Sequence, residues 1–549
     1  MMKTLVLIMG IGAALAAPAT NATAAPPPKA PPPPQLMSGL GDVHHPVSTK
    51  NKQAQQFFDQ GLKFVYGFNH DEARRSFEQA ARLDPKLAMA WWGVALTLGP
   101  NYNLPVDAER EKAGYDAVQK AVALQANASE PERAYINALV VRYSNDPKVD
   151  PHQLDRAYKD AMGKLFVRYP DDLDAATLYA ESIMNLNPWH LWTLDGKPAE
   201  GTEEIVALLE SVLKRDPNHL GANHYYIHAV EASTHPERGL ASAARLEKLA
   251  PAAGHLVHMP AHIYARVGDH AAAAHSNQVA AAADKTFLAQ TKQQGVYPLM
   301  YYSHNLHFLA YDATMDGNFA EAKDAAARLV ANVAPSVKMM PMLEGFLPTP
   351  MLVLVAFERW ADILKLPAPD PSLATTTAVW HFARGLAQAN LFNTAGGAEE
   401  QLAWQAVVAQ IPPDTAYDDQ NKTSAVFEVH KNLLLGALAR SRGDHKDAVD
   451  NLTRAVAAED ALNYSEPPAC YPPARPLLGR ELMAGQQFAE AEKVFRADLE
   501  KNPRDGRALA GLRDSLTAQN RTYEAQQIDE QYKTAWKTPA AISSKTHKH

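Results

Sequence analysis

Internal repetition constrains the fold of this chain more than any other feature of its sequence. The pairs Asp216-Pro217 and Ala250-Pro251 recur at an interval of about 34 residues and enclose two apolar patterns of helical period. Such an interval is typical of repeat architectures, in which each unit buries its apolar face against the next unit. The 549-residue chain is therefore expected to be one long repeat array.

One copy of the repeat is especially clear, between Gln55 and Pro85. Small and aromatic residues occupy fixed stations along it, namely Gly61, Phe64, Ala73, Phe77, Ala80 and Pro85. Gly and Ala allow two antiparallel helices to approach closely, and Pro ends the second helix. In these stations the chain resembles the tetratricopeptide-repeat (TPR) family. A shorter signature, Gly followed five or six residues later by Ala, recurs at Gly268/Ala273, Gly317/Ala322, Gly443/Ala448 and Gly485/Ala491.

The resemblance implies an all-α fold, a TPR-type solenoid (superhelix) of helical hairpins whose concave groove binds peptides or partner proteins. The repeats are expected to form an N-terminal group over residues 41–190, a central His-rich group over 191–336 and a C-terminal group over 376–537. A loop-like insert rich in Pro and Met is expected at 337–375. A disordered tail is expected at 538–549.

The segment 1–24 is typical of a cleavable signal peptide. Lys3 gives a positive start, an apolar stretch follows, and Ala22-Thr23-Ala24 is a small-residue cleavage site. The apolar stretch is shorter than the roughly 20 residues that span a bilayer. An uncleaved membrane anchor is the alternative. A Pro-rich spacer follows at 25–40. We therefore expect a periplasmic or secreted protein with no membrane span.

Charge and cysteine content exclude several functional classes. The 53 Lys and Arg are outnumbered by 61 Asp and Glu, which gives a net charge of −8. A nucleic-acid-binding protein needs a clustered positive face, so nucleic acid is not an expected partner. A single Cys excludes an internal disulfide and Cys-based zinc, haem or iron–sulfur motifs.

Histidine carries the main functional signal in the sequence. Eleven of the 21 His lie between His219 and His307. Their positions relative to the repeat landmarks, the Pro that ends one repeat and the Gly that marks the next turn, recur in three successive repeats. The residues at these positions are His224, His228, His255, His258, His262, His304 and His307.

Helical geometry predicts that these seven imidazoles converge. Steps of three or four residues at about 100° each stay within one stripe of a helix. In TPR families this stripe of the first helix lines the concave groove, so we expect a metal site there. Imidazole suits copper, zinc and iron, and copper is expected first because the ligand set is rich in nitrogen and Cu²⁺ heads the affinity series. Glu231 shares the stripe and is expected to orient a ring or to ligate.

The sequence leaves the use of such a site open. His224 and His258 each precede a second His by four residues, but neither is followed by Glu, which excludes a zinc-peptidase motif. Two His triplets are similar in ligand type to coupled binuclear copper sites. A metal carrier or store and a metal-dependent enzyme, such as a copper oxidoreductase, remain equal hypotheses, and no catalytic residue is assigned. The alternative is a TPR scaffold that binds a peptide or partner protein in the groove.

Other His residues are expected to contribute less. His44 and His45 follow the spacer and are expected to be mobile, with a role as extra ligands as the alternative. His70 and His270 begin second helices and are expected to be exposed to solvent.

Three further segments are assigned structural roles. The aromatic stretch at 187–192 is expected to cover part of the surface. The Met residues of the 337–375 insert are expected to pack, with Cu(I) binding as the alternative. Glu466 and Arg475 are expected to form an ion pair in the rigid segment before the last repeats.

Overall fold

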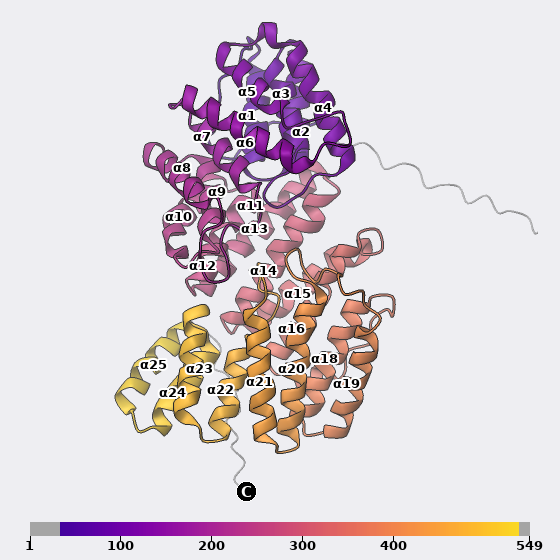
Figure 1. The fold of residues 1–549 in the computed structure, drawn as a ribbon, viewed down its shortest axis with the longest axis vertical. Helices are drawn as coiled ribbons and strands as arrows, with labels where there is room; N and C mark the ends of the chain where they lie inside the picture. The colour runs from indigo at the N-terminus through magenta and orange to yellow at the C-terminus, as the bar shows by residue number, and fades with distance from the viewer. Residues whose placement is uncertain (1–32, 537–549) are drawn as a thin grey trace, which may run out of the picture.

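The computed structural model describes residues 33–536 and consists of helices joined by short connections (Figure 1). The expected signal peptide and C-terminal tail lie outside these residues. Within 33–536 the only β-type pairings are three isolated bridges, and no helix is both long and apolar enough to cross a membrane. The predicted all-α solenoid of helical hairpins is confirmed.

The helices fall into three consecutive groups that follow the chain from top to bottom of Figure 1. The N-terminal group consists of α1 (Lys52–Tyr66), α2 (His70–Leu83), α3 (Ala88–Leu98), α4 (Ala108–Ala123), η1 (Gln125–Asn127), α5 (Glu130–Val140), α6 (Pro151–Arg168) and α7 (Leu173–Met184). The central group consists of α8 (Thr202–Arg215), α9 (Leu220–Val230), η2 (Pro236–Gly239), α10 (Leu240–Leu249), α11 (Gly254–His258), α12 (Pro260–Arg266), α13 (His270–Thr291), η3 (Tyr297–Tyr301), α14 (Tyr302–Met315) and α15 (Phe319–Val333).

The C-terminal group continues without a long gap. It consists of η4 (Ala334–Ser336), η5 (Pro341–Phe346), α16 (Thr349–Ala356), α17 (Trp360–Ile363), α18 (Ala374–Asn390), α19 (Thr394–Val408), α20 (Thr423–Ser441), α21 (His445–Asp460), α22 (Ala474–Ala484), α23 (Phe488–Lys501), α24 (Gly506–Ala518) and α25 (Thr522–Ala535). The Pro- and Met-rich stretch expected as a loop thus contains three helices, the short η5 and the α-helices α16 and α17. Met339 and Met342 in it are largely exposed, whereas Met351 is buried in the core.

The Gly/Ala signature has a clear structural basis in the turn of each hairpin. Gly268, Gly317 and Gly443 adopt φ of 77°, 77° and 78°, a left-handed conformation that Gly adopts without steric cost. The next residue caps the second helix, as Asp269 does by accepting a hydrogen bond from the backbone N–H of Ala272. The Ala of each pair is fully buried. In the longer copy the left-handed residue is Gln486 rather than Gly485.

Aromatic plugs fit between small residues as the TPR resemblance implies. Phe77 of α2 is fully buried and lies between Gly61 of α1 and Gly93 of α3. A Cβ atom at either glycine would lie 2.5 Å from the Phe77 ring, closer than van der Waals contact permits. The hairpin α1–α2 and the following helix α3 are therefore locked together by one ring.

Both ends of the solenoid fold back onto the central group. Gly221 of α9 packs against the ring of Tyr66, and the N–H of Ala252 donates to the carbonyl of Gly39 at 2.8 Å. From the other side, the Trp536 ring packs against Gly317. The first helices of the central repeats are therefore enclosed by chain from both directions rather than open along one groove.

This folding corrects three expectations about solvent exposure. His45 is not mobile, because its Nδ1 lies 2.7 Å from Asp174 Oδ2 and its ring packs edge-on against Tyr135. His70 and His270 are buried, with 8% and 6% exposure. His70 Nδ1 contacts the carbonyl of Thr97, and His270 Nδ1 lies 3.0 Å from Asp312, because the start of each second helix packs against the first helix of the next repeat.

Candidate metal centre

The first helices of three successive central repeats supply the candidate site. His224 and His228 lie on α9, His255 and His258 on α11, His262 on α12, and His304 and His307 on α14. Pro260 has no N–H, so the first helix of the middle repeat is divided at Met259 into α11 and α12. Met259 keeps helical dihedral angles (φ −50°, ψ −36°), and the side chains of His258 and His262 stay on a common face, with their Nε2 atoms 2.7 Å apart.

The first triad consists of His224, His228 and His255, which bring one ring nitrogen each within 4.8 Å of one another. His224 Nδ1 lies 2.6 Å from the carbonyl oxygen of Tyr66, and His228 Nδ1 lies 2.8 Å from Glu231 Oε1. Both partners only accept hydrogen bonds, so each Nδ1 carries the proton and each Nε2 presents a lone pair. Neither Nε2 has a hydrogen-bond partner in the described residues, nor does either ring nitrogen of His255.

The second triad consists of His258, His262 and His304. His258 Nδ1 lies 2.6 Å from Asn277 Oδ1, and Asn277 is oriented because its amide donates to the carbonyl of Ala273. His262 Nδ1 lies 2.7 Å from Glu231 Oε2 and also contacts Glu466. His258 Nε2 therefore presents a lone pair, and it lies 2.7 Å from Nε2 of His262, whose Nδ1 makes no hydrogen bond in the described chain. With its proton on Nε2, His262 donates to His258. With its proton on Nδ1, facing Glu231, it offers a second lone pair beside that of His258.

Glu231 connects the two triads. Its two carboxylate oxygens contact His228 of the first triad and His262 of the second. The rings of these two histidines lie 5.6 Å apart, and those of His255 and His258 lie 5.8 Å apart. The two triads therefore form one continuous cluster, with Glu231 as the outer partner that fixes the orientation of one ring in each.

Burial determines the charge of the cluster. Five of the six triad histidines are 0–2% exposed, and His304 is half-buried. Burial, followed by neighbouring imidazoles, lowers the pKa of His255 and His304 well below the usual value. Burial would raise the pKa of Glu231, but His228 and His262 lower it below its usual range. Burial thus favours the neutral form of His224, His255, His258, His262 and His304 and leaves Glu231 as a carboxylate, a combination that suits a cation.

Aromatic side chains enclose both triads. Phe68 packs against all three rings of the first triad, with centroids 4.5 Å from His224, 5.8 Å from His228 and 5.7 Å from His255. Phe308 packs in the same way against the second triad. Trp189 comes from the aromatic stretch at 187–192 and lies over His228 together with Tyr102. These rings exclude water and lower the local dielectric constant.

His307 is the one predicted ligand that lies outside both triads. It is on the same helix as His304, but its ring packs edge-on against Phe346 at 5.5 Å and lies 6.5 Å from Tyr471. Burial lowers its pKa to about 4. Its position is therefore that of a neutral histidine beside the cluster, packed against residues of the C-terminal group.

Several contributors to the site were not identified from the sequence. Glu466 was expected to pair with Arg475, which is wrong, because Glu466 contacts His262 and Arg475 instead pairs with Asp460. Burial and the nearby Glu231 raise the pKa of Glu466 well above its usual range. Asn277 and the carbonyl of Tyr66 carry no sequence signal, since their roles depend on packing between helices.

The arrangement provides two adjacent sets of neutral nitrogen donors. Each triad offers three imidazoles, the ligand number that leaves an open coordination position on a tetrahedral metal ion. Ring orientation is fixed by acceptors on the opposite nitrogen, as is usual for metal-ligating histidines. Imidazole donors of this kind suit copper, zinc and iron.

Comparisons with known proteins assign neither a family nor a function to the chain. No protein-family model and no curated protein sequence matches the chain. A chain of the Cut9–Hcn1 hetero-tetramer of the APC/C is similar with 14% identity and a TM-score of 0.31, covering 84% of this chain and 76% of that one. Human IFIT1 is similar with 12% identity and a TM-score of 0.31, covering 89% and 92%.

The TPR domain of P58(IPK) is similar with 11% identity and a TM-score of 0.22, covering 85% of this chain and 99% of that domain. Likeness at this level assigns no functional residue to the present chain. The chain is a helical-repeat scaffold of TPR type, on the strength of its own glycine, alanine and aromatic packing.

Proposed function

We propose that this protein holds two transition-metal ions, one in each histidine triad, with copper as the first candidate and zinc or iron next. The observation that carries the proposal is the convergence of the triads: one ring nitrogen from each histidine of a triad lies within 4.8 Å of those of the other two, and the Nε2 atoms of His258 and His262 lie 2.7 Å apart. A metal ion would accept one lone pair from each of these nitrogens.

Unpaired nitrogen atoms across the cluster support the same proposal. The Nε2 atoms of His224 and His228 and both ring nitrogens of His255 are buried without hydrogen-bond partners in the described part of the chain. Each buried polar group left unpaired costs about 1–3 kcal/mol. A core that served packing alone would gain stability from apolar residues at these positions, whereas a metal ion uses every one of the lone pairs.

Burial of the cluster favours chemistry at the metal over carriage or storage. Three protein ligands leave a position for a small molecule, and the enclosing rings of Phe68 and Phe308 keep bulk water away from it. We therefore favour a metal-dependent enzyme, with copper-dependent redox chemistry first. Peptide binding at these histidines is disfavoured, because their side chains are not on an open surface. Export, inferred from residues 1–24, is part of the proposal.

Elemental analysis tests the proposal directly. The protein is purified with His547 and His549 changed to Ala, reconstituted with copper or zinc, and freed of loosely bound metal. We expect two ions per chain. His224→Ala and His304→Ala should each lower the content by about one ion, and the double variant His228→Ala/His262→Ala should lose both.

The matched control changes His235 and His275 to Ala, because both are exposed histidines of the same central group. This variant should keep the full metal content. Metal-free protein after reconstitution, or unchanged content in the His228/His262 variant, would contradict the proposal and leave a peptide- or protein-binding scaffold as the better function.

A further inference from the structure

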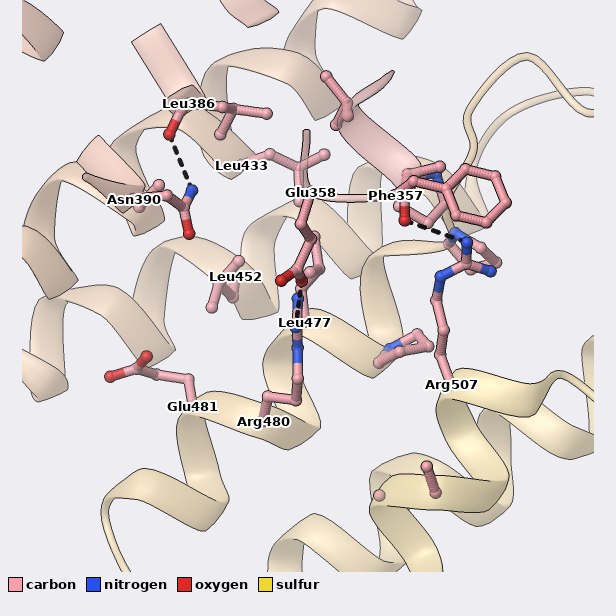
Figure 2. Close-up of a pocket in the computed structure, with 18 of the residues that line it drawn as sticks. Phe357, Glu358, Leu386, Asn390, Leu433, Leu452, Leu477, Arg480, Glu481 and Arg507 are labelled. Carbon is pink, nitrogen blue, oxygen red and sulfur yellow. Dashed lines mark hydrogen bonds and ion pairs between the residues drawn. The ribbon is translucent and has the colours of Figure 1, made fainter. Parts of the chain in front are cut away.

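A cavity lies in the C-terminal group, away from the histidine triads. It has a volume of about 370 Å³ and is lined mainly by residues of α16, α18, α20, α22 and α24, some of which Figure 2 shows. This volume lies in the range of small-molecule sites. Its walls are mainly apolar, with Leu433, Leu452 and Leu477 facing the space. We name this cavity the arginine pocket, after the residues described next.

Four arginines line the apolar space, and one of them, Arg359, pairs with Asp362 at 2.8 Å. Arg480 pairs with Glu358. Arg507 stacks on the Trp536 ring at 4.8 Å and donates to the carbonyl oxygen of Ala356 at 3.1 Å. These two arginines are thus held by partners from neighbouring elements and give the pocket a fixed positive wall.

Arg440 differs from the other three arginines of the pocket. It donates to the neutral side-chain oxygen of Asn390 and has no ion-pair partner among residues 33–536. Burial and the nearby Arg480 lower its pKa. Of the acidic residues of the wall, Glu358 pairs with Arg480, Glu481 accepts from His445 and Asp514 pairs with Arg513. Arg440 is therefore the one arginine of the pocket without a carboxylate within ion-pair distance in the described chain, and an anion bound in the pocket would supply one.

We propose that the arginine pocket binds a small organic anion, a carboxylate attached to an apolar body of about ten carbon atoms. The carboxylate pairs with Arg440, and the apolar body displaces water from Leu433, Leu452 and Leu477. Charge complementarity selects the anion, and the apolar lining excludes acids without an apolar body. This proposal does not depend on the metal centre.

Calorimetric titration of the full chain with decanoate tests the proposal. We expect one saturable site per chain. Decanamide removes the charge and acetate removes the apolar body, so each should bind at least tenfold more weakly. Arg440→Gln should weaken decanoate binding at least tenfold. Arg442→Gln is the matched control, because Arg442 lies at the end of the same helix but is exposed and pairs with Asp447.

A second variant keeps the proposal testable even if the Arg440→Gln protein fails to fold. Leu433→Trp fills the pocket without removing a charge, and it should abolish decanoate binding while the circular dichroism stays unchanged. Absence of saturable binding, or equal affinity for decanamide, would overturn the proposal. A peptide with a C-terminal Leu carboxylate serves as a further probe. If it binds more than tenfold more tightly than decanoate, the ligand is a protein tail and the small-molecule proposal is overturned.

Discussion

Many buried polar side chains in this protein form hydrogen bonds or ion pairs with residues that lie far away in the sequence. His430 shows what happens where no partner is supplied. Its ring stacks on Phe382 at 4.1 Å, its Nδ1 has no hydrogen-bond partner in the described chain, and burial lowers its pKa to about 3. The folded protein therefore holds this histidine neutral at pH values where the unfolded chain is protonated.

This depressed pKa predicts a loss of stability in acid. Between about pH 6.5 and about pH 3 the unfolded state binds a proton at His430 that the folded state does not, so the free energy of unfolding falls as the pH falls through this window. From about pH 7 to about pH 5 the expected loss is about 2 kcal/mol. The His430→Phe variant has no such group, so its free energy of unfolding should fall by about 2 kcal/mol less than that of the native chain between the two pH values. Urea unfolding of the metal-free proteins at pH 7 and at pH 5 measures this difference.

The control for this prediction is His235→Phe, because the His235 side chain is 70% exposed. That variant should show the same pH dependence as the native protein. An unchanged acid loss in His430→Phe would mean that His430 is already protonated in the folded state.

At the scale of elements, the hairpin is the unit that the sequence predicts well. Gly268, Gly317 and Gly443 mark the turns because only the left-handed conformation closes them, and the buried Ala residues follow from helix period. The histidine stripe follows from the same period. The partners of the stripe could not be predicted, because Tyr66, Asn277 and Glu466 reach it only through the packing of other helices.

The hairpin plug leads to a prediction about packing. Gly61→Ala should destabilise the N-terminal group by about 1–3 kcal/mol, because the Phe77 ring cannot move away from the new methyl group without meeting Gly93. Hydrogen exchange of amides in α1 to α3 measures this locally. Gly485→Ala is the control, since its nearest neighbour lies at 3.5 Å. Equal exchange in the two variants would argue against the plug.

At the scale of the whole molecule, contacts that skip many repeats close the solenoid. Gly268 lies against the carbonyl of Pro503, Gly317 lies against Trp536, and Arg507 donates to the carbonyl of Thr314 at 3.4 Å. Solenoid repeats ordinarily contact their neighbours alone. Here the C-terminal repeats support the turns of the central repeats directly.

Removing the C-terminal repeats should speed amide exchange at the turns of the central repeats, which lie far away in the sequence. A chain that ends at Asn502 lacks α24 and α25, so amides at residues 266–270 and 315–319 should exchange faster. Amides of α5 and α6 serve as the internal reference and should not change. Unchanged exchange at both turns would show that the long-range contacts add nothing to local stability.

Closure of the solenoid also fixes the number of repeats. In an open array, duplication or loss of a hairpin changes the length and leaves every local contact in place. In this chain, one hairpin more or fewer between α15 and α22 would carry Glu466 away from His262 and Trp536 away from Gly317. Surfaces and connections can therefore vary without breaking these contacts, whereas a gain or loss of one hairpin over this stretch would break them.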